Sequence, residues 1–82
     1  NPFNPVTIIN FNVERFEKIT ISIFDLNGIK VKTLLDKYLN KGIYSIEWNG
    51  TDINGKSLSS GTYIYQYQSS ENIISKKMIL LK

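Results

Sequence analysis

The sequence predicts an all-β sandwich of about seven short antiparallel strands. Apolar and polar side chains alternate along most of the chain, and no stretch repeats its apolar residues every 3.6 positions. Residues that favour turns separate these alternating segments at regular spacing. With 82 residues the chain has the length of one small domain, so most of its apolar residues are needed for the core.

The first two strands are predicted from period-two alternation. Residues 7–13 place Ile9, Phe11 and Val13 on one face, with asparagines on the other. Residues 18–25 likewise place three isoleucines on one face, opposite Thr and Ser. Each segment therefore has one face for the core and one for solvent.

A tight hairpin is predicted next, at Asn27-Gly28. Asn and Gly tolerate the positive φ angles that two-residue turns demand. Residues 29–35 then return as a third strand. The polar segment 36–41 is irregular and is predicted to form at most a short edge strand.

The second half of the chain continues the strand pattern. Gly42 opens a strand in which Tyr44, Ile46 and Trp48 share a face. The longest loop, residues 49–60, is rich in Gly, Asn, Asp and Ser, which are typical of turns. The last two strands are predicted over residues 62–68 and 73–81, with a turn at Glu71-Asn72 between them.

One local spacing favours an Ig-like form of the sandwich. Leu58, Gly61 and Tyr63 follow the Leu-x-x-Gly-x-Tyr pattern of a tyrosine corner, in which the Tyr hydroxyl bonds back to the main chain. Gly61 would allow the close approach, and Leu58 would plug the end of the core. Together with Trp48, these residues are predicted to shape the fold.

The composition argues against most kinds of chemistry. The chain has no Cys and no His, which removes the usual zinc, haem and iron–sulfur ligands and the Cys–His and Ser–His nucleophiles. Glu47 and Asp52 are a weak candidate for acid–base catalysis, because a small sandwich has little room for the cleft that paired carboxylates need. Ser57, Ser59 and Ser60 lie in a turn-rich loop, where serine is common. The sequence predicts no catalytic site and no bound cofactor.

The charge pattern argues against nucleic acid and membrane. The net charge of +3 is spread along the chain, and Lys76-Lys77 is the only adjacent basic pair. Nucleic-acid-binding domains usually concentrate basic residues in a patch or stripe. The longest apolar run, Met78–Leu81, is far shorter than the ~20 residues of a membrane-spanning helix. No nucleic-acid partner and no stable membrane insertion are predicted.

The aromatic residues have two interpretations. Trp48, Tyr63, Tyr65 and Tyr67 would form a platform for sugar rings if they faced solvent. Aromatic side chains bury large areas and dominate small cores, which favours the core for the first three. Tyr67 is left open between core and surface.

The Asp52–Gly55 segment resembles half of a calcium loop. Oxygen-bearing side chains alternate at Asp52 and Asn54, and Gly55 allows a turn. No further acidic residue follows until Glu71. The segment is more simply a turn, and its calcium binding stays open.

The carboxyl end combines basic and apolar residues in a strand pattern. Chain ends are usually polar and frayed, whereas residues 75–82 stay strand-like to a final Lys. One interpretation is an ordinary last strand, and the other is a tag that a partner protein pairs with at a sheet edge. From the residues alone both remain open. An exposed apolar edge of this kind would also promote a dimer in isolation.

Five segments of the chain stand out in order: Asn1–Thr7, Phe24–Gly28, Trp48–Asp52, Leu58–Tyr63 and Lys76–Lys82. In this order they resemble the type A C-terminal sorting domain of the type IX (Por) secretion system. The Trp48–Tyr63 region is also similar to the Ig-like domain of the flagellar hook-capping protein, an assembly scaffold. Both relatives imply an Ig-like sandwich.

The resemblance to a sorting domain implies a non-catalytic secretion signal. Residues 1–82 would be one domain, with 1–6 as a linker to an N-terminal cargo domain and 73–82 as the terminal strand signal. The implied partners are the type IX translocon and a sortase-like surface protease that removes the domain. The cargo would pass through the periplasm to the cell surface of a Gram-negative bacterium. The implied recognition residues are Lys76, Lys77, Met78, Ile79, Leu80, Leu81 and Lys82. The alternative is a carbohydrate-binding or structural accessory module of a secreted multidomain enzyme.

Overall fold

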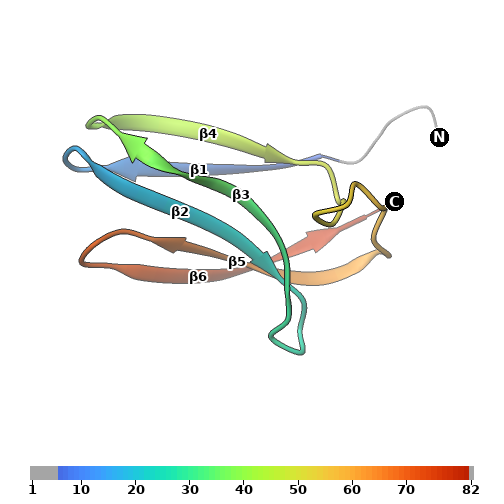
Figure 1. Cartoon of the computed structure of the whole chain (residues 1–82). Helices are drawn as coiled ribbons and strands as arrows, with labels where there is room; N and C mark the ends of the chain where they lie inside the picture. The colour runs from blue at the N-terminus through green and yellow to red at the C-terminus, as the bar shows by residue number, and fades with distance from the viewer. Residues whose placement is uncertain (1–5, 82) are drawn as a thin grey trace.

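The architecture comes from a computed structural model, in which residues 6–81 are described. The regular secondary structure of these residues consists of β-strands, so the all-β prediction is confirmed. None of them belongs to a helix that would be long enough to cross a membrane. The six strands are β1 (Thr7–Val13), β2 (Glu17–Phe24), β3 (Lys30–Leu39), β4 (Gly42–Trp48), β5 (Gly61–Gln68) and β6 (Ile73–Leu80) (Figure 1).

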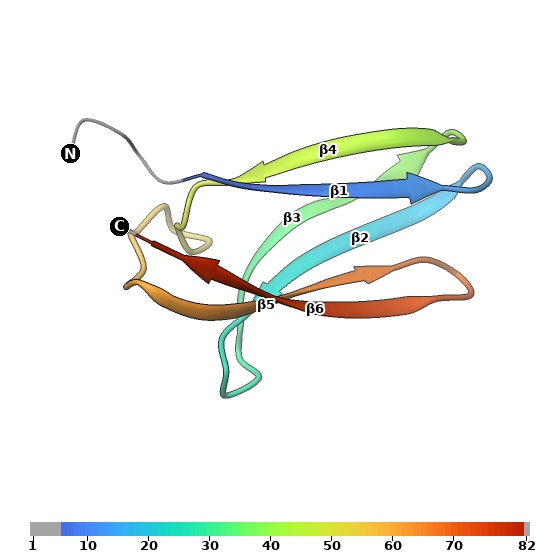
Figure 2. The ribbon, with the colours of Figure 1, turned by 180° about the vertical axis from the view of Figure 1, so that it is seen from behind.

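The strands form two antiparallel sheets of unequal size. β1 and β4 make a two-stranded sheet, and the other four strands follow the order β3-β2-β5-β6. The views from the front and from behind show β1 and β4 as one layer against the larger sheet (Figures 1 and 2). The chain changes layer after β1, β3 and β4. This is an Ig-like β-sandwich, as predicted.

The structure has six strands rather than about seven because β3 is longer than predicted. Residues 36–39 continue this strand instead of forming a separate edge segment. Asp36 lies opposite Thr20, whose hydroxyl donates a hydrogen bond of 3.3 Å to it, and Lys18 Nζ lies 3.4 Å from the same carboxylate. β3 is an edge strand, and edge strands tolerate charged side chains. The polar composition of residues 36–39 therefore does not end the strand.

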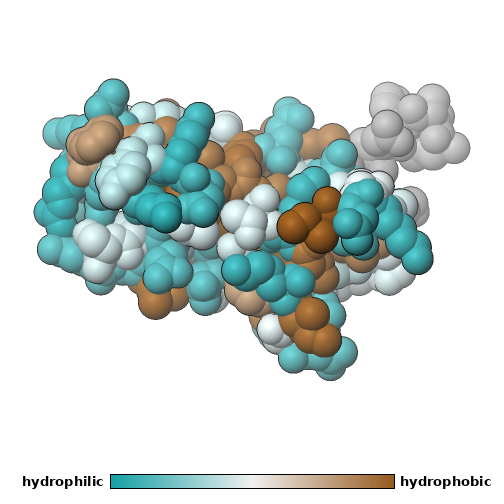
Figure 3. All heavy atoms as spheres, in the orientation of Figure 1, coloured by the Kyte–Doolittle hydropathy of each residue, from teal (hydrophilic) through white to brown (hydrophobic). Residues whose placement is uncertain are grey.

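The hairpin between β2 and β3 has a longer turn than predicted. The amide of Gly28 donates to the carbonyl of Asp25, and the amide of Asp25 donates to the carbonyl of Ile29, both at 3.0 Å. Within this turn only Gly28, at φ +83°, has a positive φ, and Asn27 does not have one. The loop has three residues rather than two. Exposed apolar side chains at this turn form the brown protrusion in Figure 3.

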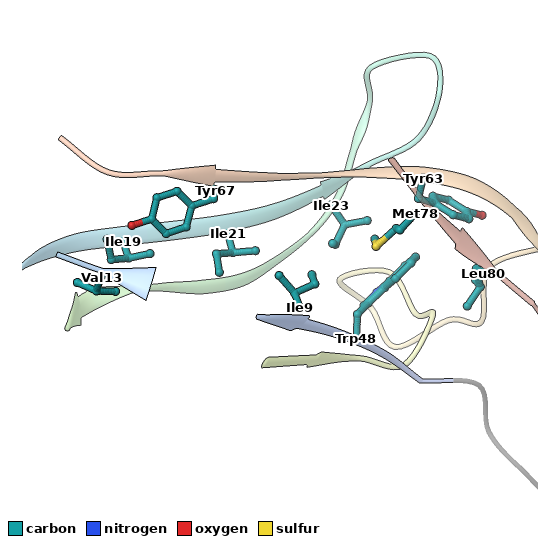
Figure 4. Packing of buried hydrophobic residues seen from close by; sticks show 10 residues of the cluster. All are labelled: Ile9, Val13, Ile19, Ile21, Ile23, Trp48, Tyr63, Tyr67, Met78 and Leu80. Carbon is teal, nitrogen blue, oxygen red and sulfur yellow. The ribbon is translucent and has the colours of Figure 1, made fainter. Parts of the chain in front are cut away.

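The core fills the space between the sheets. It draws on alternate positions of every strand except β3, which adds partly buried leucines. The isoleucines of β2 are fully enclosed because this strand is paired on both sides. The buried apolar residues are Ile9, Val13, Ile19, Ile21, Ile23, Trp48, Tyr63, Tyr67, Met78 and Leu80 (Figure 4).

Candidate functional site

The predicted tyrosine corner lies at the start of β5. The Tyr63 hydroxyl donates a hydrogen bond of 2.7 Å to the carbonyl oxygen of Ser59. Between them, Gly61 has a φ of +155°, a backbone conformation that residues with a side chain rarely adopt. Leu58 packs against the core beside them. The hydrogen bond therefore ties the loop to the start of the strand that follows it.

A second corner with the same spacing was missed in the sequence. The Tyr44 hydroxyl donates a hydrogen bond of 2.7 Å to the carbonyl oxygen of Asn40, just before β4. Leu39, Gly42 and Tyr44 repeat the Leu-x-x-Gly-x-Tyr spacing of the corner at β5. A search for that spacing along the whole chain would have found it.

Trp48 lies in the core, next to the corner at β5. Its side chain is 0% exposed, and its ring meets Tyr63 edge to face, with centroids 5.2 Å apart. The indole Nε1 donates a hydrogen bond of 2.9 Å to the carbonyl of Thr51, so the one polar atom of the ring is satisfied. Trp48 is therefore not available as a sugar platform.

The remaining tyrosines of β5 also face inward. Tyr67 is buried, whereas Tyr65 is only partly buried and packs against the core. Tyr65, predicted to lie in the core, thus packs against it with partial burial, and Tyr67, which the prediction left open, belongs to the core. Burial raises the pKa of Tyr67, and the charges of Glu17 and Glu14 raise it further.

The Asp52 segment forms a turn like the one at Asp25. Asp52 Oδ1 accepts hydrogen bonds from the amides of Asn54 and Lys56, at 2.9 and 3.0 Å. Asp25 Oδ1 accepts the two equivalent bonds in the other turn. The carboxylate oxygen offered as a calcium ligand is therefore engaged by the main chain. Among residues 6–81, no three His, Cys, Asp or Glu side chains gather to hold a metal ion.

The terminal strand β6 divides into core and surface residues. Met78 and Leu80 are 9% and 1% exposed and belong to the core. The Leu80 side chain packs against Gly50, where a Cβ atom would lie only 2.9 Å from Leu80 Cδ1. These two members of the predicted recognition set are thus part of the folded sandwich.

The other described members of that set are exposed. Lys77 and Ile79 lie on the outer face of β6, and Ile79 is 64% exposed. Lys76 is opposite Tyr65 on the inner face but remains exposed, and so does Leu81. β6 hydrogen-bonds only to β5 within residues 6–81, so it is an edge strand. The predicted signal residue Lys82 and residues 1–5 of the predicted 1–6 linker lie outside the described residues.

The comparisons with known proteins agree with this architecture. A family model described as the FlgD Ig-like domain matches residues 6–72. The chain belongs to this family. The match extends well beyond the Trp48–Tyr63 region in which the sequence showed the similarity. β6 follows the matched residues.

Two solved structures resemble this FlgD Ig-like domain. FlgD from P. aeruginosa has a TM-score of 0.70 and 19% identity, over 92% of this chain and 58% of that one. FlgD from Xanthomonas campestris, whose structure is described as giving insights into the hook capping essential for flagellar assembly, has a TM-score of 0.71 and 23% identity, over 94% of this chain and 56% of that one. The domain thus spans little more than half of either protein. No curated protein matches it.

Proposed function

We propose that this FlgD Ig-like domain is a C-terminal secretion signal that directs a cargo protein across the outer membrane through the type IX system. The observation that carries the proposal is the exposed outer face of β6, with Lys77 and Ile79 on an edge that no other strand of residues 6–81 pairs with. A partner pairing with this edge would gain main-chain hydrogen bonds and read alternate side chains.

The order of segments in the sequence supports the same proposal. The residues that resemble the sorting signal, 76–82, follow the part of the chain that the FlgD Ig-like family model matches. The shared fold would supply the scaffold and β6 the specific element. The cargo domain would precede the signal in the chain, with the translocon and a sortase-like surface protease as partners. The cargo would pass through the periplasm and end at the surface of a Gram-negative cell.

The test must separate recognition from folding. Removal of the residues after Lys77 would delete Met78 and Leu80 from the core, so a truncation would fail for structural reasons. Exposed substitutions avoid this problem. A passenger protein fused ahead of the domain would carry Lys77→Glu with Ile79→Ser, in a bacterium that has type IX machinery.

A matched control is available on other edge strands. Lys37→Glu with Ile43→Ser changes the same residue types at exposed positions of β3 and β4. We expect surface passenger to be lost with the β6 variant and kept with the control, while both remain folded by circular dichroism. Equal delivery by both variants would refute the assignment of the signal to β6, and failure of the unmodified domain would refute the secretion role.

A second candidate function follows from the FlgD likeness itself. An Ig-like domain of this family would act as a structural module in flagellar hook capping. Replacement of the corresponding domain of the X. campestris protein by residues 6–81 tests this directly. Motile cells would support the assembly role, and cells that lack hooks despite a stable chimeric protein would argue against it.

A further inference from the structure

A cleft opens between the two sheets along β1 and β6. Its volume is about 270 Å³. Phe11 of β1 forms one side, and Tyr65, Tyr67 and Ile74 of the larger sheet form the floor. The cleft exists because the smaller sheet has two strands and the larger one four. Ile74 faces the inside of the sandwich and is nevertheless 47% exposed, since no strand of residues 6–81 covers it.

The edge of β1 that borders this cleft lacks the usual protection. Within the described residues, β4 is the only strand that pairs with β1, so its other edge has no strand partner. The Tyr67 hydroxyl donates a hydrogen bond of 3.4 Å to the carbonyl oxygen of Asn12, close to the end of β1. Natural edge strands commonly carry charged residues or proline, which hinder pairing with other chains. The other three edge strands have such charges, for example Lys37 in β3, Glu47 in β4 and Lys77 in β6. The segment Thr7–Val13 has no charge and no proline.

We infer that the free edge of β1 is an acceptor site for an extended segment of another polypeptide. The segment would add a third strand to the smaller sheet and pair with the main chain of β1. Its alternate side chains would enter the cleft above Tyr65 and Ile74 and cover their exposed apolar surface. This inference stands apart from the proposed secretion role, which concerns the outer edge of β6.

The shape of the cleft favours a single strand over a second copy of this domain. The inner face of β6 forms part of the floor, so β6 extends beyond the edge of β1. A second sandwich that approached β1 edge to edge would bring its own β6 against this one. A lone extended segment needs only the width of one strand, about 4.8 Å.

Charges at one end of the cleft indicate the chemistry of the segment. Arg15 is paired with Glu71, which neutralises both. Glu14 and Glu17 line the same end, where β1 finishes, and the ionised Glu17 accepts two hydrogen bonds from Ser70. The segment that fits has apolar residues at alternate positions and a basic residue near these two carboxylates.

A blocked heptapeptide of the sequence Lys-Thr-Val-Thr-Tyr-Thr-Val is the probe. In antiparallel pairing its Lys lies near Glu14, and a peptide of reversed sequence serves for parallel pairing. Amide chemical shifts measured during titration give the affinity and the location. We expect shifts at Phe11, Tyr65 and Ile74, and slower hydrogen exchange along β1. A version N-methylated at the residues that pair with β1 should not bind.

Two substitutions on β6 provide the matched comparison. Ile74→Lys places a charge on the floor of the cleft, whereas Ile73→Lys changes the neighbouring exposed residue on the opposite face. Both positions are exposed enough for the fold to persist. We expect Ile74→Lys to weaken binding about tenfold or more and Ile73→Lys to leave it unchanged.

Several results would overturn the inference. They are equal binding by the two variants, shifts confined to β4 or the outer edge of β6, and no binding of either peptide up to about 1 mM. Concentration-dependent dimerisation that protects β1 from exchange would identify a second copy as the occupant instead. If the amides on both edges of β1 are already protected from hydrogen exchange in the monomer without peptide, the chain covers this edge itself and the inference is wrong.

Discussion

The hydroxyl of Tyr44 donates a hydrogen bond of 2.7 Å to the carbonyl oxygen of Asn40, four residues earlier in the chain. Tyr63 and Ser59 repeat this bond at the same length and spacing. One corner begins β4 in the small sheet, and the other begins β5 in the large sheet. Each sheet is thus tied to the loop through which the chain enters it.

The two corners are expected to differ in energy because they differ in burial. Tyr63→Phe removes a partly buried hydrogen bond and should lower the free energy of unfolding by about 1 kcal/mol. Tyr44→Phe removes an exposed one and should cost less, about 0.5 kcal/mol. Urea midpoints with unchanged slopes provide the measurement. A larger loss for Tyr44→Phe would contradict the role given to burial.

Gly50 is expected to tolerate no side chain. Its φ is +77°, and a Cβ atom would lie 2.9 Å from Leu80 Cδ1 in the core. Backbone strain and overpacking should together cost about 3 kcal/mol in Gly50→Ala. Gly28→Ala is the control, since φ is +83° there and nothing lies within 4 Å of the added Cβ. The control should lose only about 1 kcal/mol, so equal losses in thermal unfolding would rule out the clash with Leu80.

Truncation of the side chains of two neighbouring residues of β6 should change stability by very different amounts. Leu80→Ala opens a cavity in the core and should cost about 3 kcal/mol. Ile79→Ala removes an exposed side chain and should change stability by less than about 0.5 kcal/mol. Chemical denaturation measures both. A large loss for Ile79→Ala would mean that this residue serves the fold and would weaken its proposed role in recognition.

Trp48 should report on the core and not on a sugar. It is the only Trp of the chain, so its fluorescence is unambiguous. Because the ring is fully buried, we expect blue-shifted emission, weak quenching by acrylamide and no change on addition of soluble polysaccharides. A saturable shift with one polysaccharide would instead support the accessory-module alternative and would require Trp48 to become exposed.

Glu17 gives the fold a defined dependence on pH. Its carboxylate accepts hydrogen bonds from the hydroxyl and then the amide of Ser70, which lower its pKa below the ordinary value of 4.5. A lowered folded-state pKa stabilises the fold above pH 4.5, and this contribution is lost as the pH falls through the lowered value. Carbon-13 titration of Glu17 should show the low pKa, and Ser70→Ala should raise it. Ser75→Ala, on β6, is the control.

Local spacing in the sequence was sufficient to predict several features. Period-two alternation located five of the strands to within two residues, because strand side chains alternate strictly between faces. The large area that aromatic side chains bury predicted the core positions of Trp48 and Tyr63. The Leu-x-x-Gly-x-Tyr spacing located the corner at Tyr63. The extent of β3 escaped prediction, because the polar residues near Asp36 lie on an edge where charge is tolerated.

The sequence by itself determined the all-β class and the presence of turns near Gly28 and Asp52, since these depend on residue type and nearest neighbours; the absence of Cys and His is a matter of composition alone. Only the tertiary structure decided the division of β6, in which Lys77 and Ile79 are exposed whereas Met78 and Leu80 are buried. The sheet order also created the cleft beside β1. Both depend on which strands lie opposite one another, and that is set by contacts between segments far apart in the chain.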